Sequence, residues 1–478
     1  MLPASRQFDA ALQIVAKLRA SGFEAYLAGG CVRDLVLGRE PVDYDVATSA
    51  TPGVVLKMFP RTFAVGAHFG VVLVATCGGA DAAGAAEAQE GSYVCTEVAT
   101  FRSDLAYSDG RHPDAVRYTL SAEEDVRRRD FTINGLLLDP LRGGGPLANA
   151  AGDFAFLRSK VLDYVGGLAD LDAGLVRAIG RAELRFAEDN LRMLRAVRFA
   201  ARFGFELEAE TRRAIRTLAA RIHAVSRERI RDELTKMLTE GHARRAFELL
   251  DETGLLAEVL PEVARMKGVE QPPQFHPEGD VWVHTLMLLD QLEPGCPATL
   301  AWGALLHDVG KPPAFRRAPD RIRFDGHVEI GVAMGAEICR RFRFSNEETR
   351  QVLALIENHM RFADAPKMKA STLKRFFRLE CFDLHLKLHR MDCMAAHGNL
   401  DIYNFVRERR AAMPEEAVRP KPLLTGRELI AAGYTPGPAF KEMLTAAEDA
   451  QLEGAVATPE AALALVRERF GAPAASAH

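Results

Sequence analysis

The chain has 478 residues, of which 48% are hydrophobic and 26% are charged, and its formal net charge is −4. This length predicts several domains with substantial cores, and the composition is that of an ordinary globular protein. The charge balance excludes a chain that is basic throughout, so any surface for nucleic acid has to be local. Seven cysteines lack paired metal-ligand spacing, which favours a reducing, cytoplasmic location.

Short strands alternate with short helices up to about residue 165. Residues 1–22 predict an amphipathic helix without the apolar core of a signal peptide, and the sequence has no apolar run long enough for a membrane span. Brief runs rich in Val, Tyr and Thr predict strands at 24–29, 44–47, 71–75 and 93–101. The Gly- and Ala-rich stretch 76–91 predicts a hairpin loop between the last two strands.

The segment GGCVRDLVLGREPVDYDVAT, residues 29–48, predicts a metal and phosphate site. Asp43 and Asp45 stand two residues apart in an apolar strand, so both side chains point to one face. Two carboxylates buried together repel without a cation, and such ligands suit Mg²⁺ in phosphoryl transfer. Gly29 and Gly30, followed by a helix, allow close approach of a triphosphate, and Arg33 is expected to donate to phosphate.

A row of arginines marks the helix predicted near residues 189–203. At 100° per residue, Arg192, Arg195, Arg198 and Arg202 share one face, and Met, Leu, Val and Ala residues share another. Four neighbouring guanidinium groups repel one another, so the pattern predicts phosphate or RNA on this face. Asp189, one turn earlier, is most simply a charge that the helix dipole favours at the N-terminus.

Beyond residue 165 the patterns are helical, and we expect no further strands. Prolines near 271–280 and 414–422 forbid a continuous helix. We therefore expect an α+β protein with a head at 1–165, a helical neck at 166–270, a second helical unit at 271–415 and a helical tail at 416–478.

Three segments, 29–48, 100–139 and 185–205, resemble the class II nucleotidyltransferases in sequence and order. This family contains the CCA-adding enzymes of tRNA and bacterial poly(A) polymerases. The resemblance extends over nearly all of the chain. It implies a head with a small mixed β-sheet, followed by all-α neck, body and tail domains.

The resemblance also implies roles for residues of the head. Glu97 would be a third carboxylate beside the aspartates, although an ordinary edge-strand glutamate is the alternative. Arg129 would contact the nucleotide, and Asp130 would orient an arginine. The alternative is that the cluster 127–129 is only a run of charges exposed to solvent. The stretch 102–113 resembles the loop with which CCA-adding enzymes switch from CTP to ATP.

In the same family, an aspartate and an arginine select the incoming base, and they correspond here to Asp189 and Arg192. The carboxylate accepts from the exocyclic amine of CTP or ATP, and the guanidinium donates to ring and carbonyl acceptors. Arg195 and Arg198 would then face the base, ribose or triphosphate.

The adjacent pair His307 and Asp308, followed by GK, resembles the HD phosphohydrolase signature. The resemblance implies the metal ligands His284, His307, Asp308 and Asp392. Imidazole and carboxylate ligands suit Ni²⁺, Co²⁺, Mn²⁺ or Fe²⁺, which activate water against a phosphate ester. His327 and His359 are expected to support these ligands or to bind a second metal.

The expected function is therefore Mg²⁺-dependent addition of the 3′ CCA of tRNA from CTP and ATP. A poly(A) polymerase or an enzyme adding only CC or only A is the nearest alternative, although residues 65–74 and the loop YSDGRHPD, residues 107–114, favour full CCA addition. A phosphohydrolase with a vestigial head is another. A non-enzymatic RNA-binding protein is a third, but it has no use for paired strand carboxylates.

Overall fold

The computed structural model describes residues 5–64, 70–77, 93–104, 116–142, 154–274, 276–277, 279–319 and 321–473. The chain divides into two compact units, Met1–Pro261 and Glu262–His478. Within the described ranges, no helix combines the length and apolarity that crossing a membrane requires.

Seven strands in the described part of the first unit form one mixed sheet, in the order β3-β4-β5-β2-β1-β8-β9. The strands are β1 (Ala25–Ala28), β2 (Asp45–Thr48), β3 (Thr62–Phe63), β4 (Val71–Cys77), β5 (Tyr93–Thr100), β8 (Leu136–Leu138) and β9 (Val161–Asp163). The β2–β5 pair is parallel, and the other neighbours are antiparallel. The predicted mixed sheet is confirmed, and the four predicted strands are its centre.

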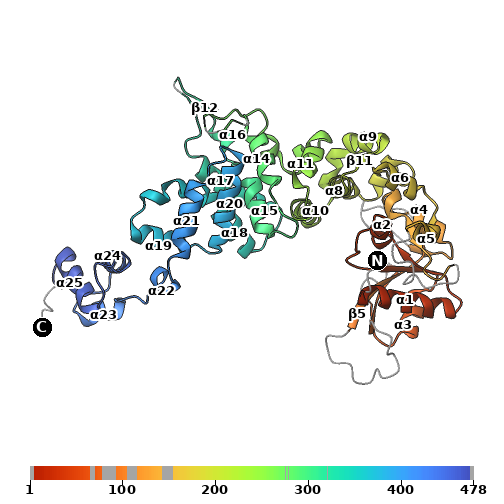
Figure 1. Cartoon of the computed structure of the whole chain (residues 1–478), viewed down its shortest axis with the longest axis horizontal. Helices are drawn as coiled ribbons and strands as arrows, with labels where there is room; N and C mark the ends of the chain where they lie inside the picture. Colours follow the sequence, from red (N-terminus) through yellow and green to blue (C-terminus); the bar gives the residue numbers. More distant parts are fainter. Residues whose placement is uncertain are drawn as a thin grey trace. The chain divides into compact units, whose positions relative to one another are not determined.

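Helices cover the sheet and continue the first unit (Figure 1). They are α1 (Arg6–Ala20), α2 (Gly30–Val36), α3 (Pro52–Met58), α4 (Ala122–Arg127), η3 (Thr132–Asn134), α5 (Phe154–Ser159), α6 (Gly167–Ala173), α7 (Ala182–Glu188), α8 (Arg192–Phe203), α9 (Ala209–Leu218), η5 (Ala219–Ala224), α10 (Arg227–Thr239), α11 (Ala243–Glu252), α12 (Leu255–Val259) and α13 (Pro261–Ala264) at the unit boundary. Helix α1 packs on β1, β2 and β5 and buries Ile14, Val15 and Leu18 completely. A second core contains Tyr26, Phe101 and Val126.

Helix α8 has the apolar face that its sequence predicts. The five residues of the predicted face, Met193, Leu194, Val197, Ala200 and Ala201, are each at most 2% exposed. They pack against α10 and α11. The helix ends at Gly204, whose φ of 69° suits glycine.

The second unit is helical. Its helices are α14 (Val281–Leu289), α15 (Ala298–Leu306), α16 (Lys311–Ala314), α17 (His327–Arg341), α18 (Asn346–Asn358), η6 (His359–Lys367), α19 (Ala370–Phe377), α20 (Phe382–Ala395), α21 (Asp401–Ala411), α22 (Glu415–Val418), α23 (Gly426–Ala431), α24 (Ala439–Glu453) and α25 (Pro459–Phe470). Helices α14, α15, α18 and α20 pack against one another. Helices α23 to α25 have their own core, which includes Leu429, Tyr434 and Val466.

The expectation that strands stop after residue 165 was wrong in detail. Two-residue strands pair at Leu175–Val176 with Glu206–Leu207 and at Arg316–Arg317 with Ile322–Arg323. Runs this short have no measurable period-2 pattern, because pairing with a distant segment rather than local alternation defines them.

Candidate active site

Three carboxylates lie near one another on, or just before, the two central parallel strands. Strand β2 begins at Asp45, which is half-buried, and Asp43 is exposed just before it. Val46 is paired with Val98, so Asp45 and Glu97 precede paired residues on adjacent strands. Burial, followed by the charges of Asp43 and Glu97, raises the pKa of Asp45 to about 7. The three groups therefore repel one another in the absence of a cation.

The turn between β1 and α2 brings glycine against an arginine. Gly29 has φ 73°, and a Cβ there would lie 3.0 Å from Nη1 of Arg129. Arg129 is held by Asp125, with 3.0 Å from Nη2 to Oδ2, and its positive charge lowers the pKa of Asp45. Glycine is required both for the backbone conformation and for this close approach. The turn, the arginine and the acidic group are thus neighbours.

A buried chain of hydrogen bonds links the three sequence motifs. The guanidinium of Arg33 donates to Oδ1 of Asp34 at 2.8 Å and to Oδ1 of Asn134 at 2.6 Å. Asn134 donates to Asp130 at 3.0 Å, and Arg195 donates to Asp130 at 2.7 and 2.9 Å. Burial raises the pKa of Asp130, but the charge of Arg195 and the bond from Asn134 outweigh it and leave the pKa at about 2.

These hydrogen bonds give two residues partners inside the protein. Asp130 accepts two hydrogen bonds from Arg195, the kind of pair that was predicted for it. Arg33 is only 4% exposed and its donors contact Asp34 and Asn134. These contacts hold Arg33 in place after the Gly29–Gly30 turn, and its donation to a phosphate stays a prediction.

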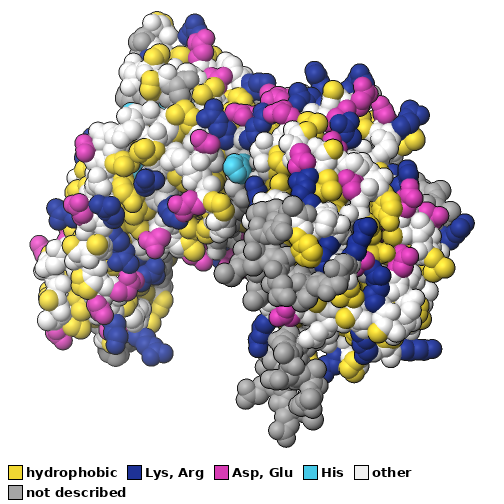
Figure 2. All heavy atoms as spheres, turned by 45° about the vertical axis from the view of Figure 1, so that its right-hand side comes forward, with side chains coloured by type: hydrophobic (Ala, Val, Ile, Leu, Met, Phe, Trp, Pro, Cys, Tyr) yellow, Lys and Arg dark blue, Asp and Glu magenta, His cyan; other side chains and the backbone are white. Residues whose placement is uncertain are grey.

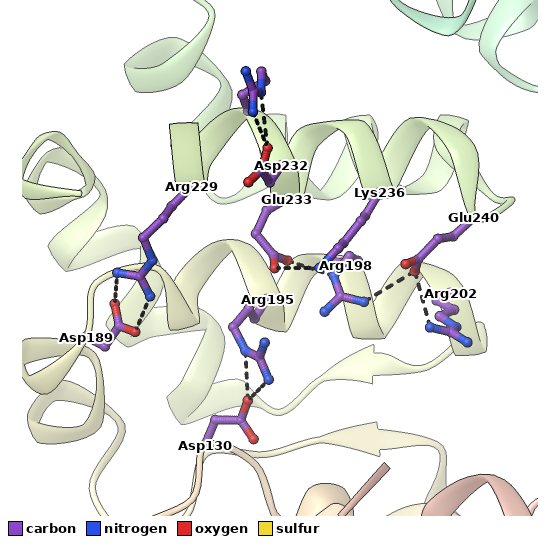
Figure 3. Close-up of polar contacts among 11 residues, drawn as sticks. Asp130, Asp189, Arg195, Arg198, Arg202, Arg229, Asp232, Glu233, Lys236 and Glu240 are labelled. Atoms are coloured by element: carbon purple, nitrogen blue, oxygen red, sulfur yellow. Dashed lines mark hydrogen bonds and ion pairs between the residues drawn. The ribbon is translucent and has the colours of Figure 1, made fainter. Parts of the chain in front are cut away.

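Asp189 is bound by an arginine from a different helix. Its carboxylate accepts from Nη1 and Nη2 of Arg229 on α10, at 3.3 and 2.7 Å, and from the backbone N–H of Leu191 at 3.0 Å (Figure 3). The last bond joins residues i and i+2 in the turn just before α8, whose N-cap is Leu191. Arg192 lies one turn on and donates to Glu188 at 2.6 Å.

The arginines on α8 are paired within the protein, so the row does not require an external anion. Carboxylates of the chain neutralise it through the pairs Arg192–Glu188, Arg195–Asp130, Arg198–Glu233, Arg198–Glu240 and Arg202–Glu240. Figure 3 shows all of these pairs except Arg192–Glu188. Arg198 is 6% exposed and donates to Glu233 at 2.7 Å. The inference that this row by itself requires phosphate or RNA was wrong, because α10 supplies acidic partners that a helical projection cannot reveal. A site at which Arg198 meets a nucleotide stays a prediction. Over the visible described surface as a whole, basic and acidic side chains are intermingled (Figure 2).

The second unit gathers two sets of metal-type ligands among the described residues. The first triad is His284, His307 and Asp392, and the second triad is Asp308, His327 and His359. Within each triad the ligand atoms lie within 4.8 Å of one another. The four ligands expected from the HD resemblance are therefore close in space, with 3.0 Å from Nε2 of His284 to Oδ1 of Asp392 and 3.1 Å from Nε2 of His307 to Oδ2 of Asp308.

Backbone carbonyls orient three of these imidazoles. Nδ1 of His307, His327 and His359 lies 2.9, 2.9 and 2.7 Å from the carbonyl oxygens of Ala304, Phe324 and Ile356. A carbonyl only accepts, so Nδ1 carries the hydrogen and Nε2 keeps its lone pair for a metal. Burial lowers the pKa of His359 to about 4 and also lowers that of His327, which keeps both rings neutral at pH 7.

Gly310 allows the second triad to form. A Cβ at Gly310 would lie 2.0 Å from the carbonyl oxygen of His327. Only glycine permits the start of α17 to approach the HD turn this closely. Lys311 follows, with Nζ 2.7 Å from Oδ2 of Asp308.

A cavity of about 700 Å³ opens beside the second triad. Its lining includes Lys311, Phe324, His327, His359, Met360 and Ile402. Charged and metal-ligand groups therefore line a largely apolar pocket, a combination typical of a small-molecule site.

Several partners were not anticipated from sequence. They are Asp125, Asn134, Glu188, Arg229, Glu233, Glu240 and Lys311. Asn134 follows Asp130 by four residues, and Lys311 follows Asp308 by three. This spacing from a motif residue was a signal by which both partners could have been predicted. Parts of three expected features, 65–69, 78–91 and 105–113, lie outside the described residues.

Comparison with known protein families divides the chain into three matched regions. Residues 25–177 match the poly A polymerase head domain, residues 204–267 match the probable RNA and SrmB-binding site of polymerase A, and residues 279–388 match the HD domain.

Curated relatives and a solved structure agree with this division. A CCA-adding enzyme of Lactobacillus gasseri is 38% identical over 286 residues, covering 59% of this chain and 64% of the relative. One of Geobacillus thermodenitrificans is 39% identical over 257 residues, covering 54% and 55%. The chain thus aligns with less than two thirds of the length of either. The crystal structure of the Bacillus stearothermophilus CCA-adding enzyme in complex with CTP matches over 98% of both chains, at 28% identity and a TM-score of 0.69.

Proposed function

The chain belongs to the class II nucleotidyltransferase family of CCA-adding enzymes and bacterial poly(A) polymerases, and we propose that it adds the 3′-terminal CCA to tRNA. CTP and ATP are the proposed substrates. The 3′ hydroxyl oxygen of the tRNA bonds to the α-phosphorus, and the bond from that phosphorus to the departing pyrophosphate breaks. The observation that carries the proposal is the acidic group of Asp43, Asp45 and Glu97 beside Arg129.

The residues of the head fit a hard divalent cation. Asp45 has a raised pKa because burial and two neighbouring carboxylates oppose its ionisation, and a cation with oxygen ligands relieves that repulsion. Asp43 and Asp45 would hold Mg²⁺, with Glu97 beside them. When bound, Mg²⁺ supplies charge neutralisation at the triphosphate and favours the ionised hydroxyl.

Side chains of the chain then bind and orient the nucleotide. Arg129 donates to the triphosphate from its position against Gly29. Asp189, oriented by Arg229, accepts from the exocyclic amine of cytosine or adenine, and Arg192 donates to acceptors of the same base edge. Asp130 keeps Arg195 in place through a two-point ion pair.

A basic groove supports a role for the helical part of the first unit in binding tRNA. A cavity of about 600 Å³ on α9 is lined by Arg212, Arg213 and Arg216. It lies within the region that matches the RNA-binding family model. Guanidinium groups in this arrangement suit the phosphates of an acceptor arm, which is recognised by shape rather than by sequence.

One extension assay tests the proposal. A tRNA ending at the discriminator base is incubated with CTP, ATP or both, and the products are sized. We expect three added residues when both nucleotides are present. A long tail from ATP alone would assign poly(A) polymerase activity, and products that stop after CC or require a CC end would assign a partial enzyme.

The two His and Asp triads favour a second activity, hydrolysis of a phosphate ester in the HD region. Three imidazoles present oriented lone pairs, and a pocket opens beside them. The residues fit a borderline metal such as Ni²⁺, Co²⁺ or Mn²⁺. Release of p-nitrophenol from a p-nitrophenyl phosphate ester by the metal-loaded full chain tests this activity, and its absence with each of these metals would refute it.

A further inference from the structure

One phenylalanine ring on α8 carries three guanidinium groups. Cζ of Arg198 lies over the ring of Phe199, 4.4 Å from its centroid, and Cζ of Arg33 and of Arg195 lie over it at 5.3 and 5.4 Å. All three distances are within the range of cation–π attraction. Phe199 is 5% exposed, so solvent screens these contacts little. The ring is thus a contact shared by arginines of two different helices, α2 and α8.

Each of these guanidinium groups also has a carboxylate partner. The ion pairs are Arg33–Asp34, Arg195–Asp130 and Arg198–Glu233. A guanidinium group can donate hydrogen bonds from its edge and contact an aromatic ring with its face. Two contacts of different kinds therefore hold each group, and loss of the ring would leave the ion pair as the remaining restraint.

The contacts form a closed circuit that begins and ends at Phe199. Arg33 donates to Oδ1 of Asn134 at 2.6 Å, and Asn134 donates to Oδ1 of Asp130 at 3.0 Å. Arg195 donates to Oδ2 of Asp130 at 2.7 Å, and both Arg33 and Arg195 lie over the ring of Phe199. Displacing any member of a closed circuit disturbs the contacts on both of its sides. Phe199 is the apolar member that completes this one.

A second ring extends the arrangement along α8. Phe203 follows Phe199 by four residues, and the two rings are stacked with centroids 6.0 Å apart and an interplanar angle of 12°. Cζ of Arg33 lies 4.5 Å from the centroid of Phe203, so this arginine contacts both rings. The start of α2, at the Gly29–Gly30 turn, is therefore connected to α8 through aromatic contacts as well as through hydrogen bonds.

We infer that Phe199 is a positioning residue for nucleotide binding, which fixes Arg33 near the glycine turn and Arg195 on the helix of Arg192 relative to each other. This inference rests on the proposed function, in which the turn lies beside the triphosphate and Arg192 contacts the base. One nucleotide can occupy both places only when their separation is constant. Phe199 acts through the arginines and needs no contact with the nucleotide.

Nucleotide addition by the full chain tests this role. Phe199→Leu keeps an apolar side chain but removes the ring, and we expect KM for CTP and ATP to rise about 10-fold while kcat falls by less than about 3-fold. Phe199→Met, which fills the space with a flexible side chain, should repeat the rise in KM. Phe199→Tyr retains the aromatic face, and its KM should stay within about 2-fold of that of the unaltered protein. KM for CTP is measured on tRNA ending at the discriminator base, and KM for ATP on tRNA ending in CC.

A phenylalanine in the core of the same unit provides the matched control. Phe247 on α11 is fully buried and, in the described part of the chain, is not one of the rings over which an arginine lies. Phe247→Leu should lower Tm at least as much as Phe199→Leu does, but leave KM for both nucleotides unchanged.

Three results would overturn the inference: an unchanged KM in both Phe199→Leu and Phe199→Met, an equal rise in KM in Phe247→Leu, or the same rise in Phe199→Tyr as in Phe199→Leu. In each of these results the unaltered protein still adds nucleotides, so the proposed function stands. Absence of nucleotide addition by the unaltered protein would instead refute the proposed function and this inference together.

Discussion

The guanidinium of Arg229 binds the carboxylate of Asp189 at two points, with 2.7 Å from Nη2 to Oδ2 and 3.3 Å from Nη1 to Oδ1. The two residues are 40 positions apart in the chain. The pair fixes the plane of the carboxylate, and a fixed acceptor is what discrimination between bases requires. Arg229 is therefore a positioning residue for Asp189.

Loss of the Asp189 carboxylate should relax the choice of base. We expect Asp189→Ala to reduce the preference for CTP and ATP over UTP by about 10- to 100-fold, since a specific base-edge contact contributes about 1–3 kcal/mol. Single-nucleotide incorporation with each triphosphate measures this. Arg229→Ala should raise the KM for CTP and ATP more than it lowers kcat, and Arg229→Lys should recover part of the effect. Asp232→Ala, on the same helix but paired with Arg231, is the control. Unchanged discrimination in Asp189→Ala would contradict the assigned role.

Removal of an acidic side chain in the head should separate the two activities. Asp43→Ala is expected to lower extension by at least about 100-fold while hydrolysis in the HD region is unaffected. Asp43 is exposed, so the free energy of unfolding should change by less than about 0.5 kcal/mol. Primer extension and phosphate-ester hydrolysis are measured on the same preparation. Glu40→Gln, an exposed change in the same segment, should leave both activities intact, and joint loss of both in Asp43→Ala would argue against independent sites.

The pKa of Asp45 predicts how stability depends on pH. This pKa is raised from 3.8 to about 7. A carboxyl group with a raised folded-state pKa binds its proton more tightly when folded, so its contribution to stability is present at low pH and is lost as pH rises toward 7. Without divalent ions, the contribution of Asp45 to the Tm of the head should therefore fall as pH rises from 3.8 to about 7, and it should stay constant above that pH.

Binding of Mg²⁺ should oppose this fall in Tm at higher pH. The ionised group binds Mg²⁺, so the increase in Tm on adding Mg²⁺ should be small at pH 5 and larger at pH 8. Asp43→Asn removes one repelling charge and should move the midpoint of the effect to lower pH. Thermal denaturation at fixed ionic strength with and without Mg²⁺ measures both, and a Mg²⁺ effect independent of pH would argue against the acidic site.

Arg198 should prove structural rather than selective. Its partner Glu233 has a side chain that is 5% exposed, and the Arg198 side chain is 7% exposed. Glu233→Gln leaves a buried guanidinium without its full counter-charge and should cost about 3 kcal/mol of unfolding free energy. Relative use of CTP, ATP and UTP should not change.

The exposed ion pair Arg158–Asp172 provides a control for the buried ion pair Arg198–Glu233. Asp172→Asn should change the unfolding free energy by less than about 1 kcal/mol, since solvent screens exposed pairs. Urea denaturation measures both variants. A small effect of Glu233→Gln together with altered nucleotide choice would place Arg198 at the nucleotide instead.

Gly310 should be intolerant of a methyl group. Its added Cβ would lie 2.0 Å from the carbonyl oxygen of His327, so Gly310→Ala should cost about 1–3 kcal/mol and lower the Mn²⁺ content of the second unit. Gly53 in α3 is the control, because a Cβ added there would meet no described heavy atom within 4 Å, and Gly53→Ala should be neutral or stabilising. Equal Tm and metal content in the two variants would contradict the close approach.

Local patterns determined much of this protein. The strands at the centre of the sheet followed from brief runs rich in Val, Tyr and Thr. The apolar face of α8 followed from its period of 3.6 residues, because burial imposes that repeat along a helix. Spacing in an apolar strand singled out Asp43 and Asp45, whereas the resemblance to known families pointed to Arg129, Asp189 and the HD pair.

Only the tertiary structure decided which charges meet. Glu233 neutralises Arg198 from 35 residues away, Arg229 reaches Asp189 across 40, and Asp308 lies between histidines of three different elements. A helical projection shows only the side chains of that helix. The sequence therefore predicted four unpaired arginines on α8, whereas each has a carboxylate partner in the structure. Coulomb interactions depend on distance in space and on burial, and neither is written in the spacing of residues along the chain.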